Sequence, residues 1–413
     1  MRTGALGLLL VVSAAASGWG QETPPAADPA ASPDPVKHSG APLGQFTIGA
    51  LVVTPTLRVS ELAFDSNVQY SAKRQADFLA SGGPGLDLAL PLGDHWKLDI
   101  QGGGQYYYFL RTKEQRRWGG SATGSLAWGT TGTRAQLSVT TGRDFSRPNL
   151  EVDARIVSDQ TTYSATFSRD LGRLTATFGA NANRRIIDEA QSYRGADLTT
   201  ALTMDRLSLR PELKLKLTPI TSLLFEGSLD LSRFPRDRSR DYEELLAGAG
   251  VMTRGIIKGQ ATAGFRQTQL SGGAQRVSRP YFRAGLSQAL GRRVSLSERY
   301  IEESIVSAFA TDGSLPTIER RSLALEMSIR FGTRIDLRLS GTREGLRSPG
   351  TVKVVLDNGT PASARRDDVT YIATTDLGIT IQRARVGAFA SYTSRNSLYF
   401  ADFGIRGLQA GVR

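Results

Sequence analysis

Residues 96–106 read WKLDIQGGGQY, with apolar or small side chains at the even positions and mostly polar ones at the odd positions. Successive side chains of a β-strand point to opposite faces, so this two-residue period predicts a strand with one apolar and one polar face. The stretch 118–128 (WGGSATGSLAW) repeats the pattern, as do 207–217 and 322–330. No comparable stretch fits a helical period. The chain from about Leu51 onward is therefore predicted to be all-β.

Aromatic residues stand at both ends of the first two of these strands: Trp96, Tyr106, Trp118 and Trp128. Ten residues rise ~33 Å along a strand, which a tilt of ~40° reduces to the ~25 Å height of the apolar band on a membrane barrel. A soluble sandwich or propeller would also alternate, but its large aromatics would lie in mid-strand, where glycines lie here. We therefore predict a transmembrane β-barrel in which these four residues form an aromatic girdle.

Short turn signals recur about every 37 to 49 residues, and longer polar connections lie between them. This alternation predicts an antiparallel up-and-down barrel of about 18 strands, within a range of 16 to 18. An even count places both termini on the periplasmic side. The apolar parity changes between Ala196 and Leu217, which predicts a bulge or an extra turn near Asp205-Arg206. The turns are expected near residues 93–95, 131–133, 170–172, 218–221, 254–255, 291–293, 332–333 and 382–383.

The N-terminus carries an export signal. One arginine, the apolar run GALGLLLVV and the small residues SAAASGWG predict a signal peptide over 1–20. Residues 21–46 are rich in proline and alanine and predict a disordered periplasmic linker. The barrel is expected over 47–413, in the outer membrane of a Gram-negative type of bacterium.

The polar face of the strands is expected to line a water-filled lumen, because a barrel of this size is too wide to fill with side chains. The chain carries a net charge of +12, and 43 of its 51 basic residues are arginine. Guanidinium groups suit carboxylate and phosphate, which predicts a preference for anionic solutes. The predicted pore-lining residues are Arg58, Lys97, Asp99, Arg210, Glu212, Lys214, Lys216, Arg330, Asp336 and Arg338.

The sequence offers little for catalysis. It has no cysteine and two histidines, His38 in the linker and His95 in a short turn, and it lacks the usual nucleophile, phosphate-loop and metalloprotease motifs. Asp367-Asp368 is interpreted as a solvated pair in a loop. Basic residues are spread over the chain and not gathered for nucleic acid. We expect no enzymatic activity, no cofactor, no metal site and no nucleic-acid partner.

Two short segments resemble a known family. Residues 54–70 (TPTLRVSELAFDSNVQY) are similar to the opening strand of the putative β-barrel porin 2 family, and 217–223 (LTPITSL) resembles a periplasmic turn of its members. The resemblance implies an outer-membrane barrel, with some members associated with exopolysaccharide secretion. The chain departs from many outer-membrane barrels by ending in Gly411-Val412-Arg413, without the terminal aromatic residue that the assembly machinery reads.

Three functions remain open at this stage: passive diffusion of solutes, exopolysaccharide secretion, and a structural or adhesive barrel with a plugged lumen. The expected plug is the predicted loop Arg347–Arg366. The expected partners are outer-membrane lipid and lipopolysaccharide, the outer-membrane assembly machinery and polysaccharide export components.

Overall fold

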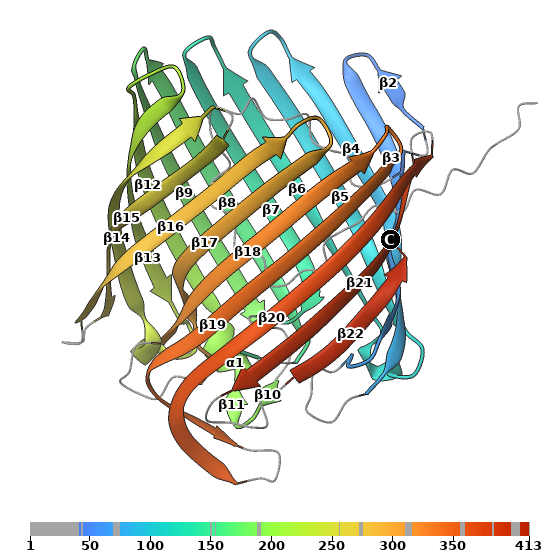
Figure 1. Ribbon diagram of the computed structural model, residues 1–413, viewed down its shortest axis with the longest axis vertical. Helices are drawn as coiled ribbons and strands as arrows, with labels where there is room; N and C mark the ends of the chain where they lie inside the picture. Colours follow the sequence, from blue (N-terminus) through green and yellow to red (C-terminus); the bar gives the residue numbers. More distant parts are fainter. Residues whose placement is uncertain are drawn as a thin grey trace, which may run out of the picture.

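The computed structural model describes residues 41–42, 44–68, 75–148, 151–152, 154–187, 191–255, 257–271, 276–309, 316–355, 360–381, 384–397 and 405–412. Eighteen antiparallel strands form a closed barrel (Figure 1), which confirms the predicted fold class and strand number. The barrel strands are β3 (Leu51–Asp65), β4 (Asp77–Leu92), β5 (Trp96–Phe109), β6 (Arg117–Gly129), β7 (Thr133–Ser146), β8 (Ile156–Leu171), β9 (Leu174–Ile187), β12 (Met204–Lys216), β13 (Thr221–Arg233), β14 (Tyr242–Arg254), β15 (Ile257–Leu270), β16 (Arg276–Leu290), β17 (Val294–Val306), β18 (Thr317–Phe331), β19 (Ile335–Val355), β20 (Pro361–Ile381), β21 (Ala384–Ser397) and β22 (Ile405–Val412).

Each barrel strand pairs with its neighbours along the chain, and β22 closes the barrel by pairing Gln409–Val412 with Leu62–Asp65 of β3. Two short strands, β1 (Ala41–Pro42) and β2 (Phe46–Ile48), pair with the remainder of the same edge of β3. They occupy the part of the β3 edge with which β22 does not pair. An exposed strand edge invites pairing with other chains, so β1 and β2 protect the seam at which the barrel closes.

Short turns join the strands at one end of the barrel, and long connections join them at the other. Seven of the eight predicted turns are found where the sequence placed them, and four of them carry a glycine at positive φ: Gly93, Gly172, Gly291 and Gly332. The eighth, at 382–383, lies outside the described residues, but β20 and β21 end and begin beside it. The first barrel strand, β3, begins at the short-turn end, and the last one, β22, runs toward it.

The structure corrects two predictions about the long connections. The expected loop Arg347–Arg366 is largely a hairpin, because β19 and β20 continue pairing to Val355↔Pro361 beyond a register shift after Arg347. A bulge or an extra turn was expected near Asp205-Arg206, and the bulge does not occur, because β12 pairs with β9 in one continuous register from Met204 to Leu215. Residues 192–202 instead form β10 (Ser192–Tyr193), β11 (Ala196–Asp197) and helix α1 (Leu198–Leu202), so the change of apolar parity marks a folded connection before β12.

The predicted signal peptide and most of the linker lie outside the described residues. The described part of the linker contains β1 and the first residue of β2. Single turns of 3₁₀ helix lie at Lys113–Gln115 and Arg238–Arg240. Within the described ranges, no helix has the length and apolar character needed to cross a membrane.

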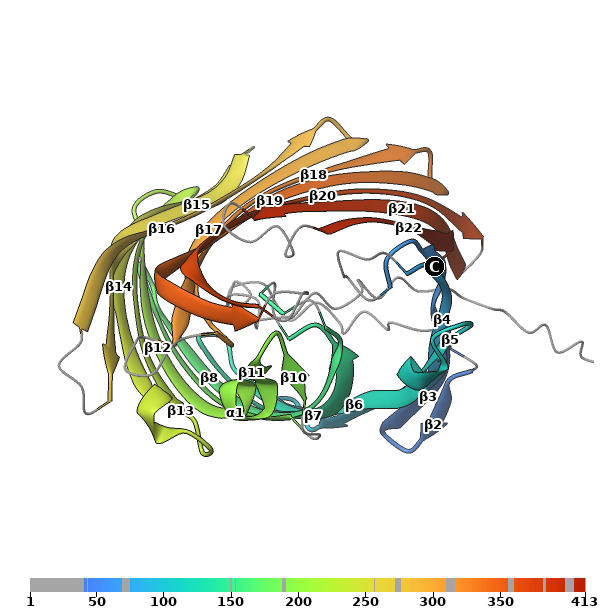
Figure 2. The ribbon, with the colours of Figure 1, turned by 90° about the horizontal axis from the view of Figure 1, so that it is seen from below.

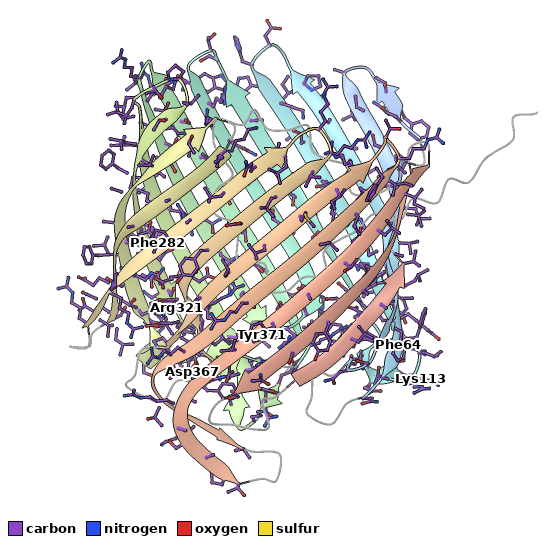
Figure 3. The ribbon with its side chains drawn as sticks, viewed as in Figure 1. Phe64, Lys113, Phe282, Arg321, Asp367 and Tyr371 are labelled. Carbon is purple, nitrogen blue, oxygen red and sulfur yellow. The ribbon has the colours of Figure 1, made fainter. Side chains whose placement is uncertain are left out.

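The barrel wall has an apolar outer face and a polar inner face. Large apolar side chains of one parity are exposed on nearly every strand, among them Phe64, Phe282 and Tyr371, which Figure 3 marks on the wall. The opposite parity faces inward, because its side chains contact each other across intervening strands. Tyr281 of β16 lies over Gly248 of β14, where an added Cβ would approach the Tyr281 ring to 2.9 Å. A side chain reaches over an intervening strand in this way only on the concave side of the wall.

Candidate functional site

Ion pairs line the inner wall between β12 and β19. Glu226 of β13 accepts hydrogen bonds from the Tyr281 hydroxyl and from the Arg283 guanidinium, both on β16. Two strands, β14 and β15, lie between the partners, and Gly248 leaves the space that the Tyr281 ring occupies. The interaction of Glu226 with β16 therefore fixes the curvature of the wall between β13 and β16 as well as the charge at Glu226.

Other inward carboxylates are also held by arginine. Asp230 lies 3.2 Å from the Arg206 guanidinium, and Glu244 lies 3.5 Å from that of Arg266. Arg320 contacts Glu303 at 2.6 Å and also contacts Glu344. Each of these inward carboxylates therefore has a guanidinium partner on the same wall, and the chain as a whole carries a net charge of +12.

On each strand, the predicted pore-lining residues have the parity opposite to that of the exposed apolar side chains. On β12, Leu207 and Leu213 are exposed on the outer face, so the even residues Arg210, Glu212, Lys214 and Lys216 face inward. Lys97 and Asp99 form an ion pair of 2.8 Å on β5, and Arg338 lies 3.6 Å from Asp336 on β19. The remaining two, Arg58 on β3 and Arg330 on β18, also lie opposite the exposed apolar parity of their strands. That these residues line a conducting pore stays a prediction.

The four predicted girdle residues come together in two pairs. Trp96 pairs with Trp128 and Tyr106 with Trp118 between β5 and β6, with ring centroids 6.1 and 5.0 Å apart. Trp96 and Trp118 are exposed on the outer face. One pair lies near the short turns and the other near the long connections. This is the placement that a girdle at two interfaces requires, although its depth in a membrane stays a prediction.

Several long connections fold over the mouth of the barrel. We call this group the lid: the connection around Glu151–Val152, the segment Ser192–Leu202, the connection Ser307–Phe309, and the distal part of the β19–β20 hairpin, 351–355 and 360–368. Figure 2 looks into this end and shows the hairpin reaching across the opening toward β10, β11 and α1. The hairpin and the β9–β12 connection are separated by six barrel strands on one side and eight on the other, so the lid spans the mouth.

An apolar cluster holds the lid together. Val352 of the hairpin packs with Leu198 and Leu202 of α1, and with Val152 and Phe309 of the two other connections. All five side chains are almost fully buried. Burying a side chain of this kind stabilises a structure by roughly 1.5–3 kcal/mol. The lid is therefore a small core of its own, built at the mouth of a polar lumen.

A buried charged triad lies within the lid. The Arg366 guanidinium is fully buried and lies 2.6 Å from Asp368 and 3.6 Å from Glu151. Glu151 also accepts hydrogen bonds from the Ser307 hydroxyl at 2.7 Å and from the backbone N–H of Ala308 at 2.6 Å. Burial raises the pKa of the Glu151 carboxyl above its ordinary value. Two carboxylates share one guanidinium, so protonation of one of them makes the triad neutral.

The triad corrects the interpretation of Asp367-Asp368 as a solvated pair. Asp368 is fully buried and paired, because β20 extends beyond the barrel rim and its inward face enters the lid. The sequence analysis also missed Glu151 and Arg366. A signal for the lid was present in Val152, Leu198 and Phe309, which are large apolar residues in otherwise polar connections.

The segment Ser192–Leu202 has a defined local structure. Asp197 caps α1, and its carboxylate accepts hydrogen bonds from the backbone N–H groups of Thr199 and Thr200 and from the Thr200 hydroxyl. These hydrogen bonds, that of the Thr200 side chain foremost, lower the pKa of Asp197. Arg194, in the β10–β11 turn, is the one non-glycine residue at positive φ among those described (φ 49°). The Asp197 cap and the β10–β11 turn place this segment beside the hairpin.

No group of three or more His, Cys, Asp or Glu side chains that could hold a metal ion occurs in the described parts of the chain. His95 lies in the exposed β4–β5 turn, and His38 lies outside the described residues. The candidate site described above combines the ion pairs of the inner wall with the lid.

Comparisons with solved structures return other barrels. OpdL of Pseudomonas aeruginosa is 16% identical with a TM-score of 0.48, over 88% of this chain and 98% of that one. The FrpB iron transporter of Neisseria meningitidis is 10% identical with a TM-score of 0.48, over 85% of this chain and 62% of that one. OccK5 (OpdH) of Pseudomonas aeruginosa is 12% identical with a TM-score of 0.45, over 87% and 96%. A search of curated proteins gave no match.

A family profile matches most of the chain. The profile described as "Putative beta-barrel porin 2" covers residues 34–312, from within the predicted linker to the connection after β17, so the β19–β20 hairpin of the lid lies beyond it. The match covers more than half of the sequence and agrees with the closed barrel and its apolar outer face. The chain therefore belongs to the β-barrel porin 2 family.

Proposed function

We propose that the protein is an outer-membrane channel for passive diffusion of small solutes, with a preference for anions. The short turns and both chain ends would then be periplasmic, and the lid would cover the outer mouth. The observation that supports the proposal is the pairing of inner-wall carboxylates with arginine, in a chain whose net charge is +12. A polar inner wall around a barrel of this size supports a water-filled passage.

Charge selectivity tests the proposal directly. The purified barrel is placed in a planar bilayer between two concentrations of potassium chloride, and the reversal potential is measured. We expect a potential of the sign that chloride permeation produces. Arg210→Glu with Lys214→Glu should move it toward the cation side, whereas Arg173→Glu with Arg292→Glu, in two exposed short turns, should move it less. A cation-selective wild-type channel would contradict the proposed anion preference.

The lid supports a second candidate, a barrel whose lumen is plugged. Its apolar core and buried triad span the mouth, as a permanent plug would. A conductance measurement distinguishes the two candidates. A gated channel conducts in some interval of voltage or pH, whereas a structural or adhesive barrel shows no conductance until the lid is removed, for example by shortening the hairpin between 348 and 365.

Exopolysaccharide secretion remains a prediction that rests on the family resemblance. A polymer chain is wider than an ion, so this role requires the lid to leave the mouth during export. Deletion of the gene should then stop the polymer from reaching the cell surface. Unchanged surface polymer in the deletion strain would rule the role out.

A further inference from the structure

Strands β6 to β9 form a part of the inner wall that carries no charge at mid-height. Their outer faces carry exposed apolar side chains, such as Trp118, Leu137, Tyr163 and Phe178, so residues of the opposite parity face inward. Ladder pairing places twelve of these inward residues in three rows of four across the strands. We call them the neutral panel: Thr123, Thr140, Thr162 and Asn183 in one row, Ser125, Ser138, Ser164 and Asn181 in the next, and Ala127, Gln136, Thr166 and Gly179 in the third.

Charged residues frame the neutral panel. The same rows continue into charged side chains on both neighbouring strands, β5 and β12, and the inward residues above and below the panel also include arginines. This frame consists of Lys97 and Asp99 on β5, Arg206 and Arg210 on β12, Arg134 toward the short turns and Arg185 toward the long connections. In a chain with 43 arginines, an uncharged surface four strands wide is a distinct feature of the wall.

Hydrogen bonds between neighbouring strands orient the side chains of the neutral panel. The bonded pairs are Thr123 with Thr140 at 3.0 Å between hydroxyls, Asn183 donating to the Thr162 hydroxyl at 2.7 Å, and Asn181 donating to the Ser164 hydroxyl at 2.8 Å. All six side chains are half-buried, so they remain accessible from the lumen. A hydroxyl offers one donor and two acceptor sites, and an amide offers two donors and an acceptor. Each pair therefore retains donors and acceptors for a ligand.

The spacing of the neutral panel favours a ligand with several hydroxyl groups. Paired residues on neighbouring strands have Cβ atoms about 4.5–5.5 Å apart, and successive inward residues of one strand are about 6.7 Å apart. A ligand with a hydroxyl on most of its carbons can contact several of these side chains at once. An ion gains less here than at the charged frame, because neutral groups do not compensate its charge. Figure 2 shows that the opposite wall, across the lumen, is formed by β18 to β21.

We propose that the neutral panel binds short, uncharged saccharides and guides them along the lumen. The proposal rests on the water-filled lumen of the proposed function and adds a second class of solute to it. Ions would pass along the charged wall between β12 and β19, and solutes without charge along β6 to β9. The saccharide hydroxyls would replace water molecules at the panel, which keeps binding weak and reversible, as diffusion through a channel requires.

Binding of maltotriose tests the proposal. The barrel is purified in lauryldimethylamine oxide, a detergent without a sugar headgroup, and the dissociation constant is measured by saturation-transfer NMR. The lid lies at the other mouth, so a solute that enters from the short-turn end does not require it to open. We expect Thr123→Val with Thr140→Val to weaken binding at least threefold, because valine keeps the shape of threonine and removes its hydroxyl. Thr123→Ser with Thr140→Ser should bind as the wild type does.

An outer-face pair provides the matched control. Thr141 and Thr161 are also hydrogen-bonded across neighbouring strands, at 3.2 Å, but their parity is that of the exposed apolar residues on β7 and β8. Thr141→Val with Thr161→Val should therefore leave binding unchanged. If the inner valine pair does not fold, Ser125→Ala with Ser138→Ala, in the next row, replaces it.

A polyethylene glycol of the same mass as maltotriose separates recognition of hydroxyl groups from simple entry into the lumen. Saturation transfer to maltotriose alone, lost with the inner hydroxyls, would support the proposal. Equal transfer to the glycol, no binding of maltotriose, or equal binding by the inner valine variant and the wild type would overturn it. A barrel that binds maltotriose through these hydroxyls but selects cations in a bilayer would contradict only the proposed anion preference.

Discussion

Val355 donates its backbone N–H to the carbonyl oxygen of Arg194 at 2.9 Å, which joins the tip of the β19–β20 hairpin to the β10–β11 turn across the mouth of the barrel. The two residues are 161 positions apart in the sequence. The adjacent Gly195 is at φ +83°, and a Cβ built there lies 3.5 Å from the Cβ of Val355. The lid is therefore closed by a contact short enough to be locked chemically.

A disulfide between the two sides should lock the lid. The separation of 3.5 Å between Cβ positions is within the range of a disulfide, and the chain contains no other cysteine. We expect oxidised Gly195→Cys with Val355→Cys to conduct less than half as much as the reduced protein in a planar bilayer, with recovery on reduction. Each single cysteine variant should be indifferent to oxidant. Equal conductance of the two forms would show that lid movement does not control the passage.

Closure of the lid should depend on pH through Glu151. Because burial raises the pKa of this carboxyl above 4.5, the closed lid binds a proton more readily than an open one. The stabilisation of the closed lid by the protonated Glu151 carboxyl is complete below the ordinary pKa of a glutamate. It is lost as pH rises through the raised pKa of Glu151. We expect a larger closed fraction at about pH 5 than at about pH 8 in single-channel recordings.

The variant Glu151→Gln tests whether Glu151 is the source of the pH dependence of lid closure, because an amide stays neutral at both pH values. The variant should remain closed over the interval, whereas Asp197→Asn, at a lid carboxylate whose pKa is lowered, should keep the pH dependence of the wild type. A Glu151→Gln channel that still opened at high pH would place the titrating group elsewhere.

Removal of the helix cap should loosen one side of the lid. Loss of an aspartate cap costs about 1 kcal/mol, or about fivefold in an opening equilibrium. Trypsin should therefore cleave Asp197→Ala after Arg194 about five times faster than the wild type. Since the pKa of Asp197 is lowered, this stabilisation is present above 3.8 and is lost as pH falls through the lowered value. Asp237→Ala, which removes the cap of the 3₁₀ turn Arg238–Arg240, serves as the matched control.

The aromatic pairs should mark the two faces of the membrane. In single-tryptophan variants, Trp96 and Trp118 should each be quenched more by lipids brominated near the headgroup than by lipids brominated deep in the acyl chain. Iodide added only outside vesicles of known insertion direction should quench Trp118 and spare Trp96. Stronger quenching by the deep bromines would remove both residues from a girdle.

Local patterns were sufficient for much of this structure. The alternation at 96–106 and 118–128 placed β5 and β6 almost to the residue, and the turn signals placed their neighbours, because strand facing and turn geometry depend on residues close in sequence. The same local logic failed between 196 and 203. Apolar residues that read as part of a strand belong to α1 and the lid core, since what they contact lies far away along the chain.

The sequence alone determined a barrel of about 18 strands with an apolar outside, a polar inside and long connections at one end, since each of these follows from a period of two and from the spacing of turns. Only the tertiary structure decided which long connections meet. Glu151 reaches Ala308 over 157 positions, Arg366 joins them from a third segment, and β16 parts from β17 where no local pattern changes. Closing the barrel brings connections from opposite sides of the wall together over its mouth, and this creates contacts that no single strand encodes.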